Sequence, residues 1–214
     1  AGIFQNTQEI DEWRAAGNGI LQSNVQPGDV RFVDRNHDGQ INDKDKVNLG
    51  NGTPDFTLGL NLGFVYKGFD FSIVANGAFG QQIVQSYRNH TRPTPNYTTA
   101  ILDRWHGEGT SNRIPRVTDS NINYQFSDLF IQNGDYLRLS TLTLGYDFAK
   151  LFKGKAVSQA RLYFQVQNLF TITGYDGMDP EIGFGSSNNS WVSGLDYGYY
   201  PRPRTVLVGV NLKF

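Results

Sequence analysis

Oxygen-bearing side chains recur on alternate residues in the stretch DRNHDGQINDKD, which runs from Asp34 to Asp45. Carboxylates and amides at this spacing supply the hard oxygen ligands that a calcium ion requires. Compared with a twelve-residue calcium loop, the stretch fills positions 1, 3, 5, 7, 9 and 12 with Asp34, Asn36, Asp38, Gln40, Asn42 and Asp45. Position 7 contributes its backbone carbonyl, position 9 acts through a water, and Gly39 occupies the sharp turn at position 6. The pattern predicts a calcium site.

Two departures from this pattern argue against a paired helix-loop-helix calcium sensor. The last ligand is Asp45 rather than Glu, which shortens its reach for bidentate binding. Neither flank has the periodicity of an amphipathic helix. An alternative interpretation is an unoccupied turn, in which Asp and Asn side chains cap their own backbone.

Catalytic patterns are weaker than the calcium pattern. His37, His90 and His106 lack the helical two-ligand spacing of zinc hydrolases, and no G-x-S-x-G elbow occurs. The chain has no Cys, so thiolate metal sites and cysteine nucleophiles are excluded. In GMDPEIG the carboxylates Asp179 and Glu181 enclose a proline, which predicts a rigid turn rather than an acid–base pair. We expect a protein that is not an enzyme.

The composition favours strands and offers no case for nucleic-acid binding. Aromatic residues make up 14% of the chain and there are 24 Gly, a mixture that fits short alternating strands better than packed helices. The formal net charge of −1 lacks the basic excess that nucleic acid attracts. No window approaches the roughly 18 consecutive apolar residues of a membrane-spanning helix.

Five segments alternate apolar and polar residues with period two, the pattern of a strand with one apolar face. They are FTLGLNLGFVY (56–66), FDFSIVANGAFG (69–80), YLRLSTLTLGYDF (136–148), ARLYFQVQNLF (160–170) and RTVLVGVNLKF (204–214). Each has about ten residues, the length of a tilted strand that crosses a bilayer. The sequence therefore predicts an all-β, antiparallel fold.

The connections between these segments alternate in length. They are short at residues 67–68 and 150–158, and long at 81–134 and 171–201. A transmembrane barrel has such short periplasmic turns and long outside loops, and the aromatic residues Tyr66, Phe69, Phe148 and Phe170 at strand ends would lie at its interfaces. A soluble antiparallel sandwich or barrel is the alternative. Five strands cannot close a barrel in lipid without an open edge, so the chain would be part of a larger barrel.

The blocks GDVRFVDRNHDGQINDKDKVNLGNGTPDFTLGLNLGFVYKGFDF, NGDYLRLSTLTLGY, VQNLFTITGYDGMDPEIG and YYPRPRTVLVGVNLKF occur in this order along the chain. Together they resemble the carboxy-terminal part of the SusC/RagA family of TonB-linked outer-membrane transporters. The resemblance implies a barrel of about 22 strands with a plugged lumen. It also implies a SusD-like surface lipoprotein as lid, and import of glycans or peptides driven through TonB. The plug and the TonB-contacting segment are not seen in this sequence.

The resemblance also implies an orientation and a location. The protein would lie in the bacterial outer membrane as a multi-pass barrel in contact with lipid. Residues 1–55 would form an extracellular segment with the calcium loop, and residues 56–214 would form barrel strands with extracellular loops 81–134 and 171–201. Calcium would then be structural, a brace for loop geometry near the lid.

Five aromatic side chains of the predicted outside loops are candidates for contact with cargo or lid, because such rings give a large contact area at low entropy cost. They are Trp105, Trp191, Tyr197, Tyr199 and Tyr200. Alternatively, these rings pack the loops on themselves. Two other functional classes remain open from the sequence: a soluble calcium-braced β-domain that binds glycans, and a TonB-dependent siderophore receptor outside this family.

Overall fold

The computed structural model of the protein describes residues 2–86, 98–118, 121–149, 157–182 and 193–214. The chain divides into two compact units. Unit 1 comprises residues 1–49 and 88–131, and unit 2 comprises residues 50–87 and 132–214. Much of the predicted outside loop 81–134 therefore belongs to the same unit as the amino-terminal segment, although a strand hairpin separates the two in sequence.

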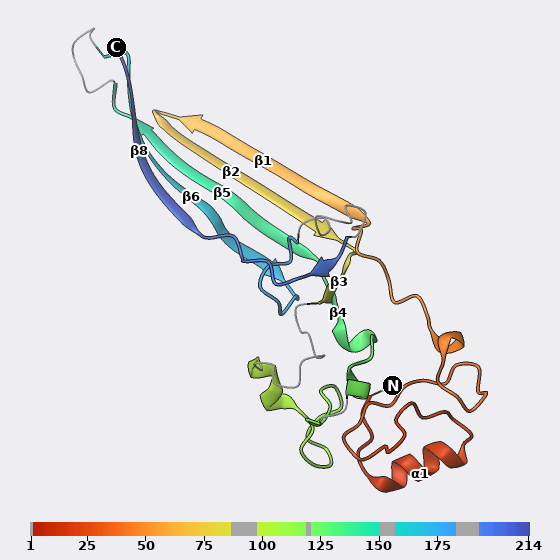
Figure 1. The fold of residues 1–214 in the computed structure, drawn as a ribbon. Coiled ribbons are helices and arrows are strands. Elements are labelled where there is room, and N and C mark those ends of the chain that lie inside the picture. The colour runs from red at the N-terminus through yellow and green to blue at the C-terminus, as the bar shows by residue number, and fades with distance from the viewer. Residues whose placement is uncertain (1, 87–97, 119–120, 150–156, 183–192) are drawn as a thin grey trace. The chain divides into compact units, whose positions relative to one another are not determined.

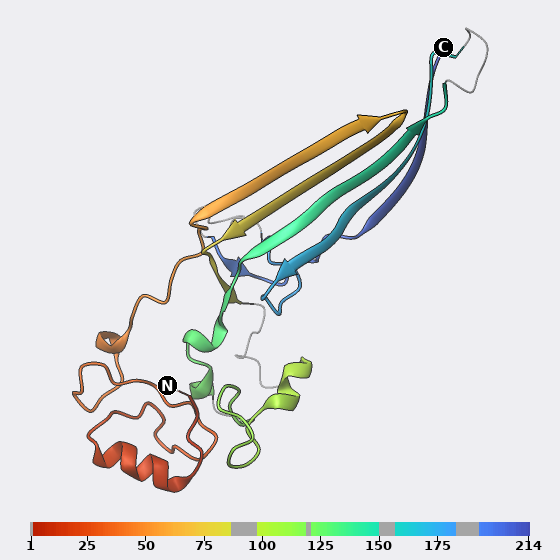
Figure 2. The same cartoon turned by 180° about the vertical axis from the view of Figure 1, so that it is seen from behind.

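Unit 2 contains a five-stranded antiparallel sheet with the order β1-β2-β5-β6-β8, in which the strands lie side by side (Figure 1 and Figure 2). The bounds are Phe56–Tyr66 for β1, Phe69–Phe79 for β2, Tyr136–Asp147 for β5, Gln159–Thr173 for β6 and Thr205–Lys213 for β8. The five predicted strands and the antiparallel fold class are confirmed, and β1 has the predicted bounds.

One face of this sheet is apolar and exposed. The cross-strand register aligns Phe64, Phe71, Leu144, Phe164 and Val208 in one row across the five strands. Four of them, all except Phe71, are between 44% and 71% exposed. A soluble domain would bury such a row, whereas a transmembrane barrel turns its apolar face to lipid.

The tight turn between β1 and β2 consists of Lys67 and Gly68, both with positive φ, as the mirror-image turns of hairpins require. An aromatic cluster lies at this end of the sheet. The ring centroids of Phe69 and Tyr146 are 4.4 Å apart, and those of Tyr146 and Phe148 are 4.7 Å apart. Aromatic rings at strand ends are typical of the membrane interface.

The alternation in β5 changes phase at Ser140, where the strand bulges. The register between β2 and β5 skips this residue, so that Leu139 and Thr141 lie opposite consecutive residues of β2. A bulge of one residue shifts the alternation by one position. Leu139 and Leu142 therefore lie on the same apolar face although they are three residues apart.

A second, small sheet forms where the two long connections meet, in the order β4-β3-β7. Its strands are Gln82–Gln85 for β3, Ile131–Asn133 for β4 and Leu195–Asp196 for β7. β3 and β7 are parallel, and the Val84 N–H donates to the Gly194 carbonyl oxygen at 2.8 Å. Residues from both predicted outside loops are thus joined by backbone hydrogen bonds.

Unit 1 contains the α-helix α1 (Thr7–Ala15) and the 3-10 turns η1 (Asp43–Asp45), η2 (Thr99–Asp103), η3 (Asn121–Tyr124) and η4 (Asp128–Phe130). The Asn6 side chain caps α1 by accepting the Glu9 N–H at 2.9 Å. Ile10 of α1 forms a small core with Phe4 and Val25. Within the described residues, no helix is long and apolar enough to cross a membrane.

Candidate functional site

The predicted calcium loop is folded by hydrogen bonds between its side chains and its own backbone. Asn36 Oδ1 accepts the Asp38 N–H at 3.2 Å, and Asp38 Oδ1 accepts the Gln40 N–H at 3.0 Å. Asn42 Oδ1 accepts the Lys44 N–H at 2.9 Å. These are the local turns by which Asp and Asn side chains stabilise their own backbone, whether or not a cation is bound.

Asp45 closes the loop on itself. Its two carboxylate oxygens accept the N–H groups of Arg35 at 2.9 Å and of Asn42 at 2.8 Å. Asn42 and Asp45 form a capping box at the start of η1. The hydrogen bond from the Asn42 N–H is the main reason that the pKa of the Asp45 carboxyl lies below its usual range.

Asp34 differs from the other acidic residues of the loop because it is buried, with 1% of its surface exposed. Its Oδ2 accepts the N–H groups of Gly19 and Gly39, both at 2.9 Å. Its Oδ1 is also buried and has no hydrogen-bond partner. A buried polar atom left without a partner costs about 1–3 kcal/mol, and more when it carries charge. Hydrogen bonds from the backbone therefore leave one of the two carboxylate oxygens of Asp34 without a partner.

The acidic side chains of the loop do not themselves converge. Among the residues that the structure describes, no three His, Cys, Asp or Glu side chains are grouped so that they could hold a metal ion. The set predicted from the sequence includes three carboxylates, those of Asp34, Asp38 and Asp45, and in the described structure these three are not grouped around one point. The structure shows the folded loop and one unsatisfied carboxylate oxygen.

The loop packs against the segment that follows α1. A Cβ atom at Gly19 would lie 2.7 Å from the carbonyl carbon of Gln40, so only glycine permits this approach. The Gly19 carbonyl oxygen accepts the indole N–H of Trp13 in α1 at 3.2 Å. Through Gly19, the position of the loop is coupled to the helix.

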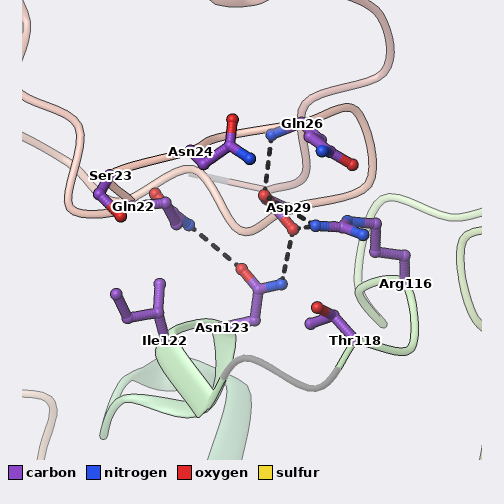
Figure 3. A pocket seen from close by; sticks show the side chains of 9 residues that line it. All are labelled: Gln22, Ser23, Asn24, Gln26, Asp29, Arg116, Thr118, Ile122 and Asn123. Carbon is purple, nitrogen blue, oxygen red and sulfur yellow. Dashed lines mark hydrogen bonds and ion pairs between the residues drawn. The ribbon is translucent and has the colours of Figure 1, made fainter.

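A polar pocket of about 310 Å³ lies elsewhere in unit 1 (Figure 3). The buried Asp29 carboxylate accepts from Arg116 Nε and from Asn123 Nδ2, both at 2.8 Å. Asn123 Oδ1 in turn accepts the Val30 N–H at 2.9 Å and the Gln22 amide at 3.1 Å. Because these buried groups satisfy one another, the pocket residues hold together two stretches far apart in the sequence.

An ion pair spans three strands on the polar face of the five-stranded sheet. Arg161 Nε on β6 lies 2.7 Å from Asp70 Oδ1 on β2, above Gly145 of the intervening strand β5. The Arg161 guanidinium also lies 4.8 Å from the ring centroid of Tyr163, whose ring covers Gly209 on β8. Side chains on one strand thus occupy the space above glycines on the next.

A second charged network joins β5 to the connection that follows β6. Arg138 is 3% exposed and contacts Asp179 at 2.5 Å and Glu181 at 3.1 Å. Glu181 also pairs with Arg202 at 2.9 Å, and Asp179 accepts the Arg202 N–H at 3.2 Å. Both carboxylates of the predicted rigid turn are therefore committed to arginines.

The sequence is 34% identical over 209 residues to the TonB-dependent receptor P3 of Formosa agariphila, covering 92% of this chain and 20% of that receptor. It is 31% identical over 197 residues to the TonB-dependent receptor SusC of Bacteroides thetaiotaomicron, covering 91% and 18%. The fold matches the structure of the RagAB peptide transporter with a TM-score of 0.61 and 27% identity, over 76% of this chain and 17% of that chain. No protein-family model matches the chain.

The chain belongs to the SusC/RagA family. It spans about a fifth of the length of the curated relatives that it matches. The resemblance inferred from the sequence blocks is confirmed, and the five-stranded sheet is the carboxy-terminal part of a SusC/RagA barrel. Its apolar face is then the lipid side, and the face with the ion pair of Asp70 and Arg161 is the lumen side.

The candidate contact residues of this SusC/RagA segment have different environments. Trp105 packs on the backbone at Gly28 and donates its indole N–H to Gln5 at 3.2 Å, within unit 1. Tyr199 is half-buried. Tyr197 and Tyr200 are 51% and 87% exposed. Trp191 lies outside the described residues.

Three buried, hydrogen-bonded polar residues of this SusC/RagA chain did not follow from the sequence pattern. They are Asp29 and Asn123 in unit 1 and Arg138 in unit 2. Arg138 lies before the bulge at Ser140. The break in the apolar–polar alternation at this bulge was the signal in the sequence that the residues before it, Arg138 included, lie on the opposite face of the sheet from the one a regular strand would give them. The partners of Asp29 lie 87 and 94 residues away, a separation over which no local pattern operates.

Proposed function

We propose that this SusC/RagA segment forms the closing part of the barrel wall in a TonB-dependent outer-membrane importer of glycans or peptides. In the proposed assembly a SusD-like surface lipoprotein closes over the outside loops as a lid. Energy would arrive through TonB, by way of parts of the whole protein that lie beyond this segment. The names of the relatives support this proposal, since they are TonB-dependent receptors, one of them SusC.

One observation carries the barrel role: the five-stranded sheet exposes an apolar face and has two edge strands. β1 pairs only with β2, and β8 pairs only with β6, within the described residues. Lipid offers no hydrogen bonds to an open edge, so in a membrane both edges require further strands. A soluble glycan-binding domain would instead bury the apolar rows. A siderophore receptor outside the family is excluded by the family membership.

The outer connection that carries Tyr197 and Tyr200 supports the lid interaction. Both rings are exposed, while the neighbouring Arg202 is anchored through Glu181 to the buried Arg138. Exposed tyrosines on a fixed base are typical of energetically important residues at interfaces, because little further ordering is needed on binding. We propose that Tyr200 contacts the lid lipoprotein.

The test uses the full-length transporter, tagged and extracted in detergent from outer membranes. We expect a SusD-like lipoprotein to co-purify with it, and Tyr200→Ala to lower the yield of that lipoprotein while the barrel amount is unchanged. Phe126→Ala, which removes another exposed ring at 69% exposure, is the matched control. Co-purification that is absent from the unaltered protein would overturn the lid proposal.

Cargo is tested separately in cells that carry the transporter as their only route for a labelled oligosaccharide or a labelled oligopeptide. We expect uptake of one class, and its loss when TonB is removed. Uptake that continues without TonB would contradict the importer mechanism, and uptake of an iron chelate alone would contradict the proposed cargo.

A further inference from the structure

The buried carboxylate of Asp34 is the starting point, because its Oδ1 has no hydrogen-bond partner and no ion pair joins Asp34 to a Lys or Arg in the described part of the chain. An anionic oxygen removed from water without a compensating group is strongly unfavourable. We propose that the loop 34–45 binds one calcium ion and that Asp34 Oδ1 is its innermost ligand.

The hydrogen bonds of Asp34 direct its carboxylate into the loop. Oδ2 of this carboxylate is bonded to the N–H of Gly39, which is the residue at the sharp turn on the far side of the loop. Oδ1 belongs to the same carboxylate, so this buried oxygen without a partner lies close to that turn. A loop that closes around one bound cation needs its first ligand in this position.

The other proposed ligands retain coordination capacity. Because the carboxylates of the loop are not grouped in the structure, Asp38 and Asp45 would turn toward Asp34 as the ion binds. A carboxylate oxygen has two lone pairs, so Asp38 and Asp45 can bind a cation while they accept the backbone N–H groups described above. Asn36 contributes its amide oxygen and Gln40 its backbone carbonyl. With a water beside Asn42, the set approaches the six to eight oxygens that calcium takes.

The chemistry of this set selects calcium over other cations. Every ligand is a hard oxygen, which disfavours zinc and copper, for which thiolates or imidazoles are the usual ligands. Magnesium demands near-ideal octahedral geometry, whereas a loop of turns with ligands on alternate residues suits the more flexible coordination of calcium. His37 adopts φ 55° between two ligand positions and is exposed, and we assign it no role.

The bound ion would brace unit 1. The Gly19 N–H donates to the same Asp34 oxygen that receives Gly39, and the Gly19 backbone lies against Gln40. A cation drawn to Asp34 would therefore fix the segment after α1 together with the loop. Without the ion, the charge on Asp34 would favour opening of this contact.

The first experiment measures calcium binding to the full-length protein in detergent, after removal of divalent ions, by titration calorimetry with calcium alone into the millimolar range. Asp34→Asn keeps an oxygen for the Gly19 and Gly39 N–H groups but removes the anionic ligand. Asp43→Asn, at a position with no ligand role and 91% side-chain exposure, is the matched control. Asp38→Ala is a second ligand variant, at an exposed position where the substitution removes one turn hydrogen bond but no buried contact.

We expect the unaltered protein and Asp43→Asn to bind one more calcium ion than Asp34→Asn, and Asp38→Ala to bind that ion at least about tenfold more weakly. Equal stoichiometry and affinity in all four proteins would overturn the proposal. This readout is independent of the proposed import function, because it needs no cargo, TonB or lid.

A second experiment tests the brace by trypsin cleavage after Arg35 and Lys44 in the same detergent-solubilised proteins. We expect calcium to slow cleavage at both sites several-fold in the unaltered protein and in Asp43→Asn, but not in Asp34→Asn. Cleavage rates that do not respond to calcium in any protein would contradict the structural role.

Discussion

Arg161 and Asp70 form an ion pair across a strand to which neither belongs. Their contact passes above Gly145, where a Cβ atom would lie 2.7 Å from Arg161 Nε. The absence of a side chain on β5 therefore permits a direct link between β2 and β6. The pair lies on the polar face, 20% and 26% exposed at its side chains, so it is partly screened by solvent.

A methyl group at Gly145 should break this link. We expect Gly145→Ala to destabilise the full-length barrel by roughly 1–3 kcal/mol, because the new Cβ atom displaces both charged side chains. Gly59→Ala, on the polar face of β1 with no atom within 4 Å of the added Cβ, should have no destabilising effect. Unfolding by denaturant in detergent compares the two. Equal midpoints would show that the space above Gly145 is not needed.

Removal of Arg138 should release the connection after β6. Arg138→Met leaves Asp179 and Glu181 without their buried counter-charge, and loss of one partner from a buried pair costs about 3–5 kcal/mol. We expect the region after residue 173 to become sensitive to protease. Arg202→Gln removes an arginine that is 56% exposed and should change stability by less than about 1 kcal/mol. A protease pattern that is the same in both variants would contradict the anchoring role of Arg138.

The two faces of β8 should respond oppositely to charge. We expect Val208→Arg, on the apolar face, to lower barrel stability by about 2–4 kcal/mol if the residue lies near the bilayer midplane. Asn211→Arg, on the polar face of the same strand, should be tolerated. Heat-dependent mobility of the full-length protein in gels measures how much barrel remains folded. Equal loss in both variants would argue against the assignment of faces.

The packing of Trp105 on Gly28 should be sensitive to one added carbon. In Gly28→Ala the Cβ atom would lie 2.9 Å from Trp105 Cδ2, and the residue has φ 91°. Gly109→Ala has a similar φ of 79° but open space around the added atom, so it reports the backbone strain alone. We expect Gly28→Ala to be less stable than Gly109→Ala by roughly 1–3 kcal/mol. Tryptophan fluorescence during unfolding measures the difference.

The strands could be predicted from the sequence because the two faces of β1 and β8 meet different environments, which imposes period two on residues such as Val206, Val208 and Val210. The short turn at Lys67 and Gly68 followed from its turn chemistry. Unit 1 could not be predicted in this way. Its fold depends on contacts between stretches as distant as Asp29 and Asn123, and neither stretch has a regular period that would reveal them.

For the candidate sites, the ligand spacing was predictable from the sequence, whereas the burial of individual side chains was not. The loop from Asp34 to Asp45 carries its ligand spacing in consecutive residues, so a local pattern reveals it. The burial of Asp34 depends on Gly19, which donates from outside that pattern, and it became visible only in the folded chain. The sequence likewise could not show that Tyr200 is exposed and Trp105 is packed, since both are aromatic residues in long connections.

The bulge at Ser140 has a consequence for changes of length in the outer connections. On its inner side the strands are locked in register, since a slip would place the bulge opposite a regular pair. On its outer side β5 stays paired over Tyr136 to Leu139, and only beyond Tyr136 do the connections leave the sheet. A change of length in the outer connections would therefore leave the pairing on the inner side of the bulge unaltered, so the exterior could be rebuilt while the barrel wall keeps its register.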